Sequence, residues 1–217
     1  MQDRNYDAVI FDMDGTLLDT LEDLKDAVNH ALRVLAMPER TLEEIRQFVG
    51  NGAERLLELA VPGGAGNPQY GRALALFREY YAVHCNDKTR PYDGVIPLLQ
   101  KLAEEGYALA IVSNKPDFAV KELCDIYFSG LAGTAAGQRE GVAKKPAPDT
   151  VQAALRELGV PKERAVYVGD SEVDVMTAAN AGIPCISVLW GFRERDFLLA
   201  HGACRFAETP EEIRDYL

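Results

Sequence analysis

Residues 8–20 read Ala8-Val9-Ile10-Phe11-Asp12-Met13-Asp14-Gly15-Thr16-Leu17-Leu18-Asp19-Thr20. The apolar residues at the start of this stretch run directly into a carboxylate, which is typical of a buried parallel strand that ends at a polar crevice. Because residues two apart on extended backbone point the same way, we expect Asp12 and Asp14 to face one site, with Met13 turned away. Gly15 then permits a sharp turn.

Two carboxylates this close repel each other unless a cation lies between them or one of them keeps its proton. A hard divalent cation such as Mg²⁺, which prefers oxygen ligands, would resolve the conflict between Asp12 and Asp14. The structural alternative is a strand end followed by an ordinary Asp-Gly turn. The longer pattern Asp-x-Asp-Gly-Thr-Leu-x-Asp, joined to an apolar strand, favours a functional site over that turn.

The composition indicates a chain that can form a sizeable core and that carries a strong negative charge. The sequence has 217 residues, 47% of them hydrophobic, and a formal net charge of −11. One large domain or two small ones fit this length. An acidic surface repels polyanions, so we expect no nucleic-acid partner, and an anionic substrate requires a metal or local cations that reverse the field.

Cysteine usage and the short apolar runs limit where the protein can act. Cys85, Cys124, Cys185 and Cys204 are scattered, with no C-x-x-C pair. This pattern favours reduced thiols in the cytoplasm over a disulfide framework or a zinc site. The N-terminus is polar and its apolar run is short, so we expect neither a signal peptide nor a membrane segment. We therefore expect a cytoplasmic protein without membrane contact, either a monomer or a homodimer.

Residues 20–88 show helical patterns and no strand pattern. Apolar residues recur at helical spacing over 21–35, 42–50, 55–61 and 70–84. The spacing of Thr41 and Glu44 predicts a capping box at the start of the second of these helices. We expect residues 20–88 to form an all-helical domain inserted into a core made of residues 1–19 and 89–217.

After residue 93 the pattern alternates between helices and short apolar runs. The predicted helices cover 95–105, 116–126, 148–158, 171–181 and a C-terminal segment from about 210. The predicted strands cover 107–112, 133–137, 165–169 and 184–189. Strands that alternate with helices specify an α/β fold with a doubly wound, Rossmann-like parallel sheet. Ligands bind beyond the carboxyl ends of such strands, where Asp12, Ser113 and Asp170 stand.

Two further segments could bind an anion at those strand ends. Ser113 follows a strand and precedes a predicted helix, where a hydroxyl and backbone N–H groups either bind phosphate or cap the helix. Lys145 stands directly before Pro146 in a Lys-Pro-x-Pro segment, whose rigid backbone can hold an ammonium against developing phosphoryl charge. Its neighbour Lys144 is expected to be a solvated surface residue.

The segment Gly169-Asp170-Ser171-x-x-Asp174 is the most specific of the later motifs. Asp170 leaves a strand, and Asp174 returns over it one helical turn later. One carboxylate could bind metal while the other orients Lys145 or a metal-bound water. The alternative is an N-capped helix with two acids in its first turn.

In this order, the motifs resemble the four motifs of haloacid dehalogenase-type phosphohydrolases, and the helical insert resembles the helical cap of that superfamily. Two short segments resemble its phosphoglycolate phosphatase branch, namely Val49-Gly50-Asn51-Gly52 and Trp190-Gly191-Phe192. The related β-phosphoglucomutases usually carry Glu-Asp-Ser-x-Ala-Gly where this chain has Gly169-Asp170-Ser171-Glu172-Val173-Asp174, and they tend to carry valine where Thr16 stands. Both departures count against a mutase.

The resemblance implies a Mg²⁺-dependent phosphatase that acts on small phosphorylated metabolites, with 2-phosphoglycolate as the expected substrate. It implies that Asp12 attacks phosphorus to form an aspartyl-phosphate, and that Asp14 serves as general acid and base. The implied metal ligands are the Asp12 carboxylate, the Asp14 backbone carbonyl and Asp170. The implied phosphate-binding residues are Thr16, which also stabilises the Asp14 loop, Ser113, Asn114 through its backbone, and Lys145, with Asp174 behind them.

The expected leaving-group contacts are Asn51 and Arg55, because an arginine can grip a carboxylate through two hydrogen bonds. The alternative is that Arg55 faces solvent on its helix. A phosphomutase or pyrophosphatase with the same core is the second candidate function, and a non-catalytic phospho-accepting protein is the third. Asp14 argues against the third, since an internal acid and base shortens the life of an acyl-phosphate.

Overall fold

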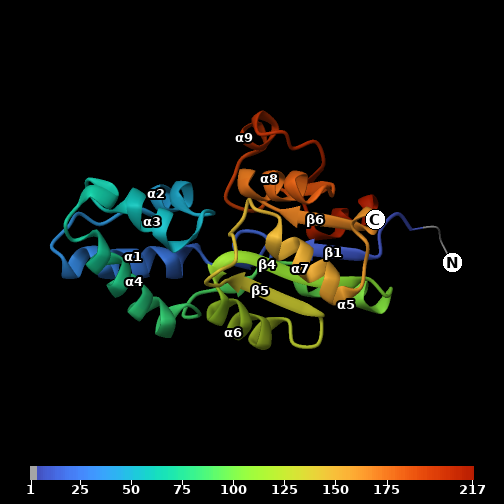
Figure 1. The fold of residues 1–217 in the computed structure, drawn as a ribbon, viewed down its shortest axis with the longest axis horizontal. Helices are drawn as coiled ribbons and strands as arrows, with labels where there is room; N and C mark the ends of the chain where they lie inside the picture. The colour runs from blue at the N-terminus through green and yellow to red at the C-terminus, as the bar shows by residue number, and fades with distance from the viewer. Residues whose placement is uncertain (1–3) are drawn as a thin grey trace. The chain divides into compact units, whose positions relative to one another are not determined.

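The computed structural model describes residues 4–217, and the chain forms two compact units (Figure 1). The core unit comprises the residues up to Leu18 together with Pro91–Leu217, and the helical unit comprises Asp19–Arg90. Two short strands, β2 (Leu18–Asp19) and β3 (Arg90–Pro91), pair with each other where the chain passes between the units. The helical unit is therefore an insertion that follows the first strand of the core unit.

Parallel strands form the central sheet of the core unit. They are β1 (Ala8–Phe11), β4 (Ala108–Pro116), β5 (Thr134–Gln138), β6 (Ala165–Gly169), β7 (Cys185–Val188) and β8 (Phe206–Ala207). Their order across the sheet is β5-β4-β1-β6-β7-β8, and the neighbouring strands pair in parallel. Strand β1 stands where the strand order reverses, which is where doubly wound sheets bind ligands. The predicted doubly wound α/β fold is confirmed.

Helices cover both faces of this sheet (Figure 1). The covering helices are α5 (Val95–Glu104), α6 (Asp117–Tyr127), α7 (Asp149–Leu158) and α8 (Glu172–Ala181), and the unit also contains α9 (Arg195–Ala200), η2 (Lys162–Arg164) and η3 (Pro210–Tyr216). Val9 and Phe11 of β1 pack in one apolar cluster with α5 and α6. Ala8 and Ile10 pack in another with α7 and α8. Since side chains alternate along a strand, cover on both faces requires the unbroken apolar run of β1.

The helical unit contains no strand between the paired strands β2 and β3 that bound it. Its helices are α1 (Leu21–Val34), α2 (Leu42–Phe48), α3 (Gly52–Ala60), η1 (Gly64–Gly66) and α4 (Tyr70–His84). Thr41 and Glu44 form the expected capping box at the start of α2. Phe77 and Tyr81 of α4 are almost fully buried, so the apolar stripe predicted for this helix packs inside the unit.

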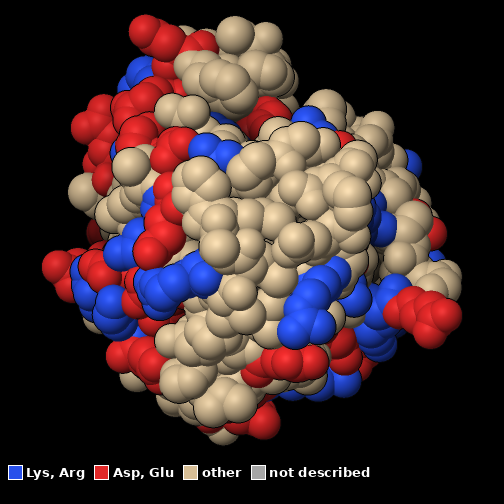
Figure 2. All heavy atoms as spheres, turned by 90° about the vertical axis from the view of Figure 1, so that its left-hand side faces the viewer, with Lys and Arg blue, Asp and Glu red and all other residues tan. Residues whose placement is uncertain are grey.

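Cations on the surface of the helical unit pair with nearby carboxylates. The pairs include Arg33–Glu39, Arg40–Glu44, Arg55–Glu58, Arg78–Glu54 and Lys88–Asp26. Figure 2 shows acidic and basic side chains mixed in this way around a broad uncharged area on one face of the molecule. Exposed pairs contribute at most about 1 kcal/mol each, so the apolar interior stabilises the unit. Among residues 4–217, no helix is both long enough and apolar enough to cross a membrane.

Some predicted boundaries were wrong. Helix α3 begins at Gly52 instead of Arg55, because the buried Ala53 extends its packed face toward the N-terminus. Strand β4 continues through Pro116, which pairs with Gln138 of β5 and precedes α6 instead of opening it. The C-terminal helix η3 is a 3₁₀ helix. Helix α9 and strand β8 were not predicted, since β8 is two residues long and gains its order from pairing with β7.

Candidate active site

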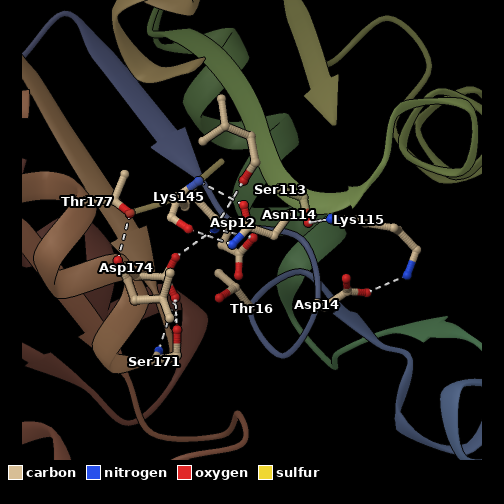
Figure 3. A network of polar contacts seen from close by, with 12 residues as sticks. Asp12, Asp14, Thr16, Ser113, Asn114, Lys115, Lys145, Ser171, Asp174 and Thr177 are labelled. Atoms are coloured by element: carbon tan, nitrogen blue, oxygen red, sulfur yellow. Dashed lines mark hydrogen bonds and ion pairs between the residues drawn. The ribbon is translucent and has the colours of Figure 1, made fainter. Parts of the chain in front are cut away.

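Adjacent strands bring polar residues to one edge of the sheet. Asp12 follows β1, Ser113 lies near the end of β4, and Asp170 follows β6. Because β4 and β6 both flank β1, these side chains converge beyond the same strand ends. Figure 3 shows Asp12 and Ser113 within a shared network of polar contacts. Strand β4 continues through Pro116, so Ser113 lies within the strand instead of just after it, and α6 begins at Asp117, one residue later than predicted.

Asp12 is a buried carboxylate held close to a cation. The residue is 7% exposed, and its backbone N–H donates to the Val168 carbonyl at 2.9 Å. Its Oδ1 lies 2.8 Å from Lys145 Nζ. Burial and then the charge of Asp174 raise the pKa of Asp12 to about 7, against the opposing charge of Lys145. A carboxylate fixed in this way beside an ammonium is suited to attack an anionic electrophile.

Lys145 is locked in place by both its side chain and its backbone. Its Nζ lies 2.8 Å from Asp174 Oδ1 and 3.0 Å from the Tyr167 hydroxyl. Its backbone N–H donates to Asn114 Oδ1 at 2.8 Å, and Asn114 Nδ2 donates to its carbonyl at 3.0 Å. Although burial opposes the charge, Asp12 and Asp174 raise the pKa of Lys145 well above its usual value. The side chain therefore stays an ammonium.

Both carboxylate oxygens of Asp174 accept hydrogen bonds. Oδ2 accepts from the Ser171 backbone at 3.1 Å and from the Ser171 hydroxyl at 2.6 Å. Oδ1 accepts from the Tyr167 hydroxyl at 3.0 Å and from Lys145 at 2.8 Å. Ser171 and Asp174 also form a capping box on α8, so the helix cap and the contact with Lys145 occur at the same residue. Asp174 is thus suited to orient Lys145.

Asp170 is 1% exposed and is held from two directions. The Thr16 hydroxyl donates to its Oδ1 at 3.3 Å, and the Phe192 backbone N–H donates to its Oδ2 at 2.7 Å. Burial and then the neighbouring carboxylates raise the pKa of Asp170 well above its usual value. A Cβ at Gly15, where φ is +83°, would lie 2.4 Å from Asp170 Oδ2. Only glycine lets the turn after Asp14 close on this carboxylate.

The acidic groups fit a divalent cation. Asp12, Asp170 and Asp174 each offer a carboxylate oxygen, and these oxygens lie within 4.8 Å of one another. When ionised, they outweigh the single charge of Lys145 in a buried space, and a divalent cation would neutralise the excess. Each oxygen of Asp174 already accepts two hydrogen bonds, so Asp12 and Asp170 are the carboxylates better suited to hold it. Oxygen ligands of this kind suit a hard cation.

The Asp14 carboxylate points toward Lys115 (Figure 3). Asp14 Oδ1 lies 2.7 Å from Lys115 Nζ, and the Lys115 backbone N–H donates to Ser113 Oγ at 3.2 Å. Met13, which stands between Asp12 and Asp14 in the sequence, is fully buried in the apolar core. The alternation therefore turns Met13 inward as expected, while the ion pair with Lys115 sets the direction of the Asp14 side chain.

No motif in the sequence assigns a role to Lys115, Tyr167 or Trp190. Two sequence features could have indicated a place in the site. Lys115 follows Ser113 and Asn114 directly, and Tyr167 places a hydroxyl in an otherwise apolar strand. Trp190 was noted only for its family resemblance. Its indole Nε1 donates to the Thr16 carbonyl at 3.0 Å, which holds the turn after Asp14.

The structure places the expected leaving-group residues in the helical unit. Asn51 immediately precedes α3. Arg55 lies inside α3, where its Nη1 is 2.8 Å from Glu58 Oε2 and its side chain is 48% exposed. An exposed pair of this spacing is ordinary for a helix surface, and it would have to open for Arg55 to hold a substrate.

Comparisons with known proteins agree with this geometry. The family described as haloacid dehalogenase-like hydrolase matches residues 9–188. A phosphoglycolate phosphatase of Mesorhizobium japonicum is 35% identical over 193 residues, covering 86% of this chain and 84% of that protein. A crystal structure of a protein from Lactobacillus delbrueckii subsp. bulgaricus, provisionally assigned as a phosphoglycolate phosphatase, has a TM-score of 0.94 at 37% identity and 99% coverage of both chains.

A more distant similarity is to a protein crystallised with a sugar bisphosphate. CbbY from Rhodobacter sphaeroides, crystallised in complex with xylulose-1,5-bisphosphate, has a TM-score of 0.75 at 27% identity. The match covers 95% of this chain and 96% of that one. The same fold thus also occurs in a protein that binds a sugar bisphosphate.

Proposed function

Since the chain belongs to the haloacid dehalogenase-like hydrolase family and hydrolyses phosphomonoesters, we propose that it requires Mg²⁺ and that 2-phosphoglycolate is its preferred substrate. The observation that carries the proposed mechanism is the buried Asp12 carboxylate with Lys145 Nζ 2.8 Å from its Oδ1. Such a pair combines a nucleophile with a cation that attracts the phosphoryl group.

Asp12 and Asp14 divide the covalent and the proton-transfer work. An oxygen of Asp12 forms a bond to phosphorus while the ester P–O bond breaks, and Asp14 gives its proton to the departing alkoxide. Water then attacks phosphorus and loses a proton to Asp14, which releases inorganic phosphate and restores Asp12. Asp12 and Asp14 therefore both take part in each of the two displacement steps.

The phosphoryl oxygens are held by Lys145, the Ser113 hydroxyl and the Asn114 backbone. The fixed position of Lys145 supports this role, because a preorganised ammonium stabilises developing charge without reorganisation. Asp174 and Tyr167 keep it there. Thr16 was expected to bind phosphate, but its hydroxyl donates to Asp170 at 3.3 Å, which supports a role in holding that carboxylate.

The metal would be held by the carboxylates of Asp12 and Asp170, with the Asp14 backbone carbonyl as a further ligand. All members of this ligand set are oxygen atoms, as Mg²⁺ prefers. When bound, Mg²⁺ supplies positive charge that neutralises the phosphoryl oxygens and the Asp12 nucleophile. It also accounts for an anionic substrate in a chain whose net charge is −11.

The names of the relatives described above support 2-phosphoglycolate as the substrate. The second candidate is a sugar phosphate, for which the similarity to CbbY with its bound xylulose-1,5-bisphosphate is the supporting observation. Asn51 and Arg55 remain the proposed contacts to the leaving group. The free state of the four cysteines supports action in the reducing cytoplasm, as a monomer or a homodimer.

A panel of phosphorylated metabolites tests the proposal by release of inorganic phosphate. We expect 2-phosphoglycolate to give a higher kcat/KM than sugar phosphates, pyrophosphate and nucleotides. We also expect EDTA to abolish turnover until Mg²⁺ is added. A sugar phosphate whose kcat/KM exceeds that of 2-phosphoglycolate by about tenfold, which corresponds to roughly 1.4 kcal/mol, would overturn 2-phosphoglycolate as the preferred substrate. Conversion of glucose 1-phosphate to glucose 6-phosphate without phosphate release would indicate a mutase, and turnover that survives chelation would exclude the metal role.

A further inference from the structure

Lys115 is a buried cation that the proposed chemistry does not use. The residue is 5% exposed and lies next to the last residue of β4. The register of β4 against β5 shifts between Val112 and Pro116, and irregularities of this kind redirect side chains beside active sites. Here the side chain is directed to Asp14, with 2.7 Å between Lys115 Nζ and Asp14 Oδ1 (Figure 3).

The two partners differ in their access to water. The Lys115 side chain is 2% exposed, whereas that of Asp14 is 20% exposed. A buried ammonium loses its hydration and therefore depends on its partner, while a partly exposed carboxylate can still be solvated. The pair Lys121–Asp117 in the same unit has nearly the same length, 2.8 Å, but its lysine is 59% exposed. Lys115 is thus committed to its carboxylate to a degree that a surface lysine is not.

The backbone around Asp14 is already fixed, which leaves the side chain as the freedom that Lys115 controls. The Gly15 N–H donates to the Leu18 carbonyl at 2.9 Å, and Asp14 forms a bridge with Leu18. A contact at Oδ1 restrains the remaining rotation of the carboxylate. This restraint matters, because a general acid must come within about 2.6–3.2 Å of the atom it protonates.

We propose that Lys115 is a positioning residue for Asp14: it holds one carboxylate oxygen and thereby keeps the other aligned for proton transfer to and from the reacting oxygens. The proposal rests on the role of Asp14 as acid and base given above. It assigns Lys115 to the leaving-group side of the reaction, whereas Lys145 serves the phosphoryl side.

The test compares three substrates in the Lys115→Met variant. They are p-nitrophenyl phosphate, 2-phosphoglycolate and 2-hydroxyethyl phosphate, the last being a close analogue without the carboxylate. The parameter kcat/KM reports transfer of the phosphoryl group to Asp12. The control is Lys121→Met, which removes the same charge from the exposed pair. Lys115→Gln and Lys115→Arg provide a milder change and a rescue, should the methionine variant fold poorly.

We expect kcat/KM of Lys115→Met to fall by about ten- to a hundredfold on both alkyl phosphates, as misplacement of a catalytic group typically does. On p-nitrophenyl phosphate it should fall by less than about threefold, because p-nitrophenolate departs without a proton. Lys115→Arg should recover part of the loss, and Lys121→Met should match the wild type on all substrates.

Other patterns overturn the proposal. A loss confined to 2-phosphoglycolate means that Lys115 binds the substrate carboxylate instead of Asp14. An equal loss on all substrates means general damage to the site, and no loss means that the pair only stabilises the fold. The double variant Asp14→Asn with Lys115→Met must be no worse than Asp14→Asn alone, since Lys115 acts through Asp14. If Asp14→Asn itself lacks the leaving-group pattern, the acid–base role fails while the Asp12 phosphatase reaction stands.

Discussion

Asp23 in the helical unit and Asp12 in the core unit are both buried carboxylates, but their surroundings differ. Asp23 is 2% exposed. Its oxygens accept the backbone N–H groups of Lys88 and Thr89 and the Thr89 hydroxyl at 2.8–3.0 Å. Asp12, in contrast, shares its space with the carboxylates of Asp170 and Asp174. Asp23 is surrounded by hydrogen-bond donors, whereas Asp12 shares a single ammonium, that of Lys145, with the other carboxylates.

The difference separates a structural acid from a functional one. Asp23 ties α1 to the segment after α4, and its ring of donors replaces the water that it lost on burial. Asp12 keeps an electrostatic conflict that the fold does not remove, and such unresolved charge marks sites where a ligand completes the structure. Burial of an acid alone therefore says little about its role. The partners of its oxygens decide it.

The strongest test is Asp12→Asn. We expect turnover to fall to less than about one ten-thousandth of the wild type, because an amide cannot form the acyl-phosphate. Stability should not fall in the absence of metal, since the change removes one charge from a repelling cluster. Phosphate release and thermal unfolding in EDTA measure the two effects. Activity near the wild-type level would exclude Asp12 as the nucleophile.

The opposite pattern is expected for Asp23→Ala. This change leaves the backbone N–H groups of Lys88 and Thr89 and the buried Thr89 hydroxyl without this acceptor, so the free energy of unfolding should fall by roughly 2–4 kcal/mol. The matched control is Asp26→Ala on the same helix, whose exposed pair with Lys88 at 2.6 Å is expected to contribute less than about 1 kcal/mol. Urea unfolding followed by circular dichroism measures both. If the two variants lose the same stability, the hydrogen bonds to Asp23 contribute no more to stability than the exposed ion pair of Asp26.

Metal binding should stabilise only the site with the unresolved charge. At a Mg²⁺ concentration of a hundred times its Kd, we expect the free energy of unfolding to rise by about 2.7 kcal/mol. Asp170→Asn should lose most of this gain, whereas Asp23→Ala should keep it. Thermal unfolding with EDTA or with Mg²⁺ provides the measurement. A gain that persists in Asp170→Asn would place the metal elsewhere.

A smaller effect is expected at Asp7, a partly exposed acid flanked by two arginines. Arg164, and more weakly Arg4, lower the pKa of Asp7 to about 2 from 3.8. Because the folded-state pKa is the lower one, the stabilising contribution is present above about pH 4 and is lost as the pH falls toward 2. The difference in Tm between the wild type and Asp7→Asn should therefore shrink between pH 5 and pH 2.5. A difference independent of pH would show that the charge of Asp7 is not involved.

Local patterns in the sequence were sufficient for most of the fold. The apolar run of β1, the capping box of Thr41 and Glu44, and the alternation of strands with helices are set by residues close together in the chain. The errors lie where distant contacts set an end, as when pairing with β5 extends β4 through Pro116. The short strand β8 likewise exists through its pairing with β7. Local propensity holds no information on such partners.

For the site, the sequence by itself determined which groups stand at the strand ends, because Asp12, Ser113 and Asp170 follow recognisable apolar runs. Only the tertiary structure decided what these groups touch. The pair of Asp14 with Lys115 joins residues 101 positions apart, and the bond of Lys145 with Tyr167 spans 22. The order of the strands and the packing of α8 on the sheet create these contacts. Burial then removes the competing water, so that a few oxygens and two ammonium groups control one another's charge.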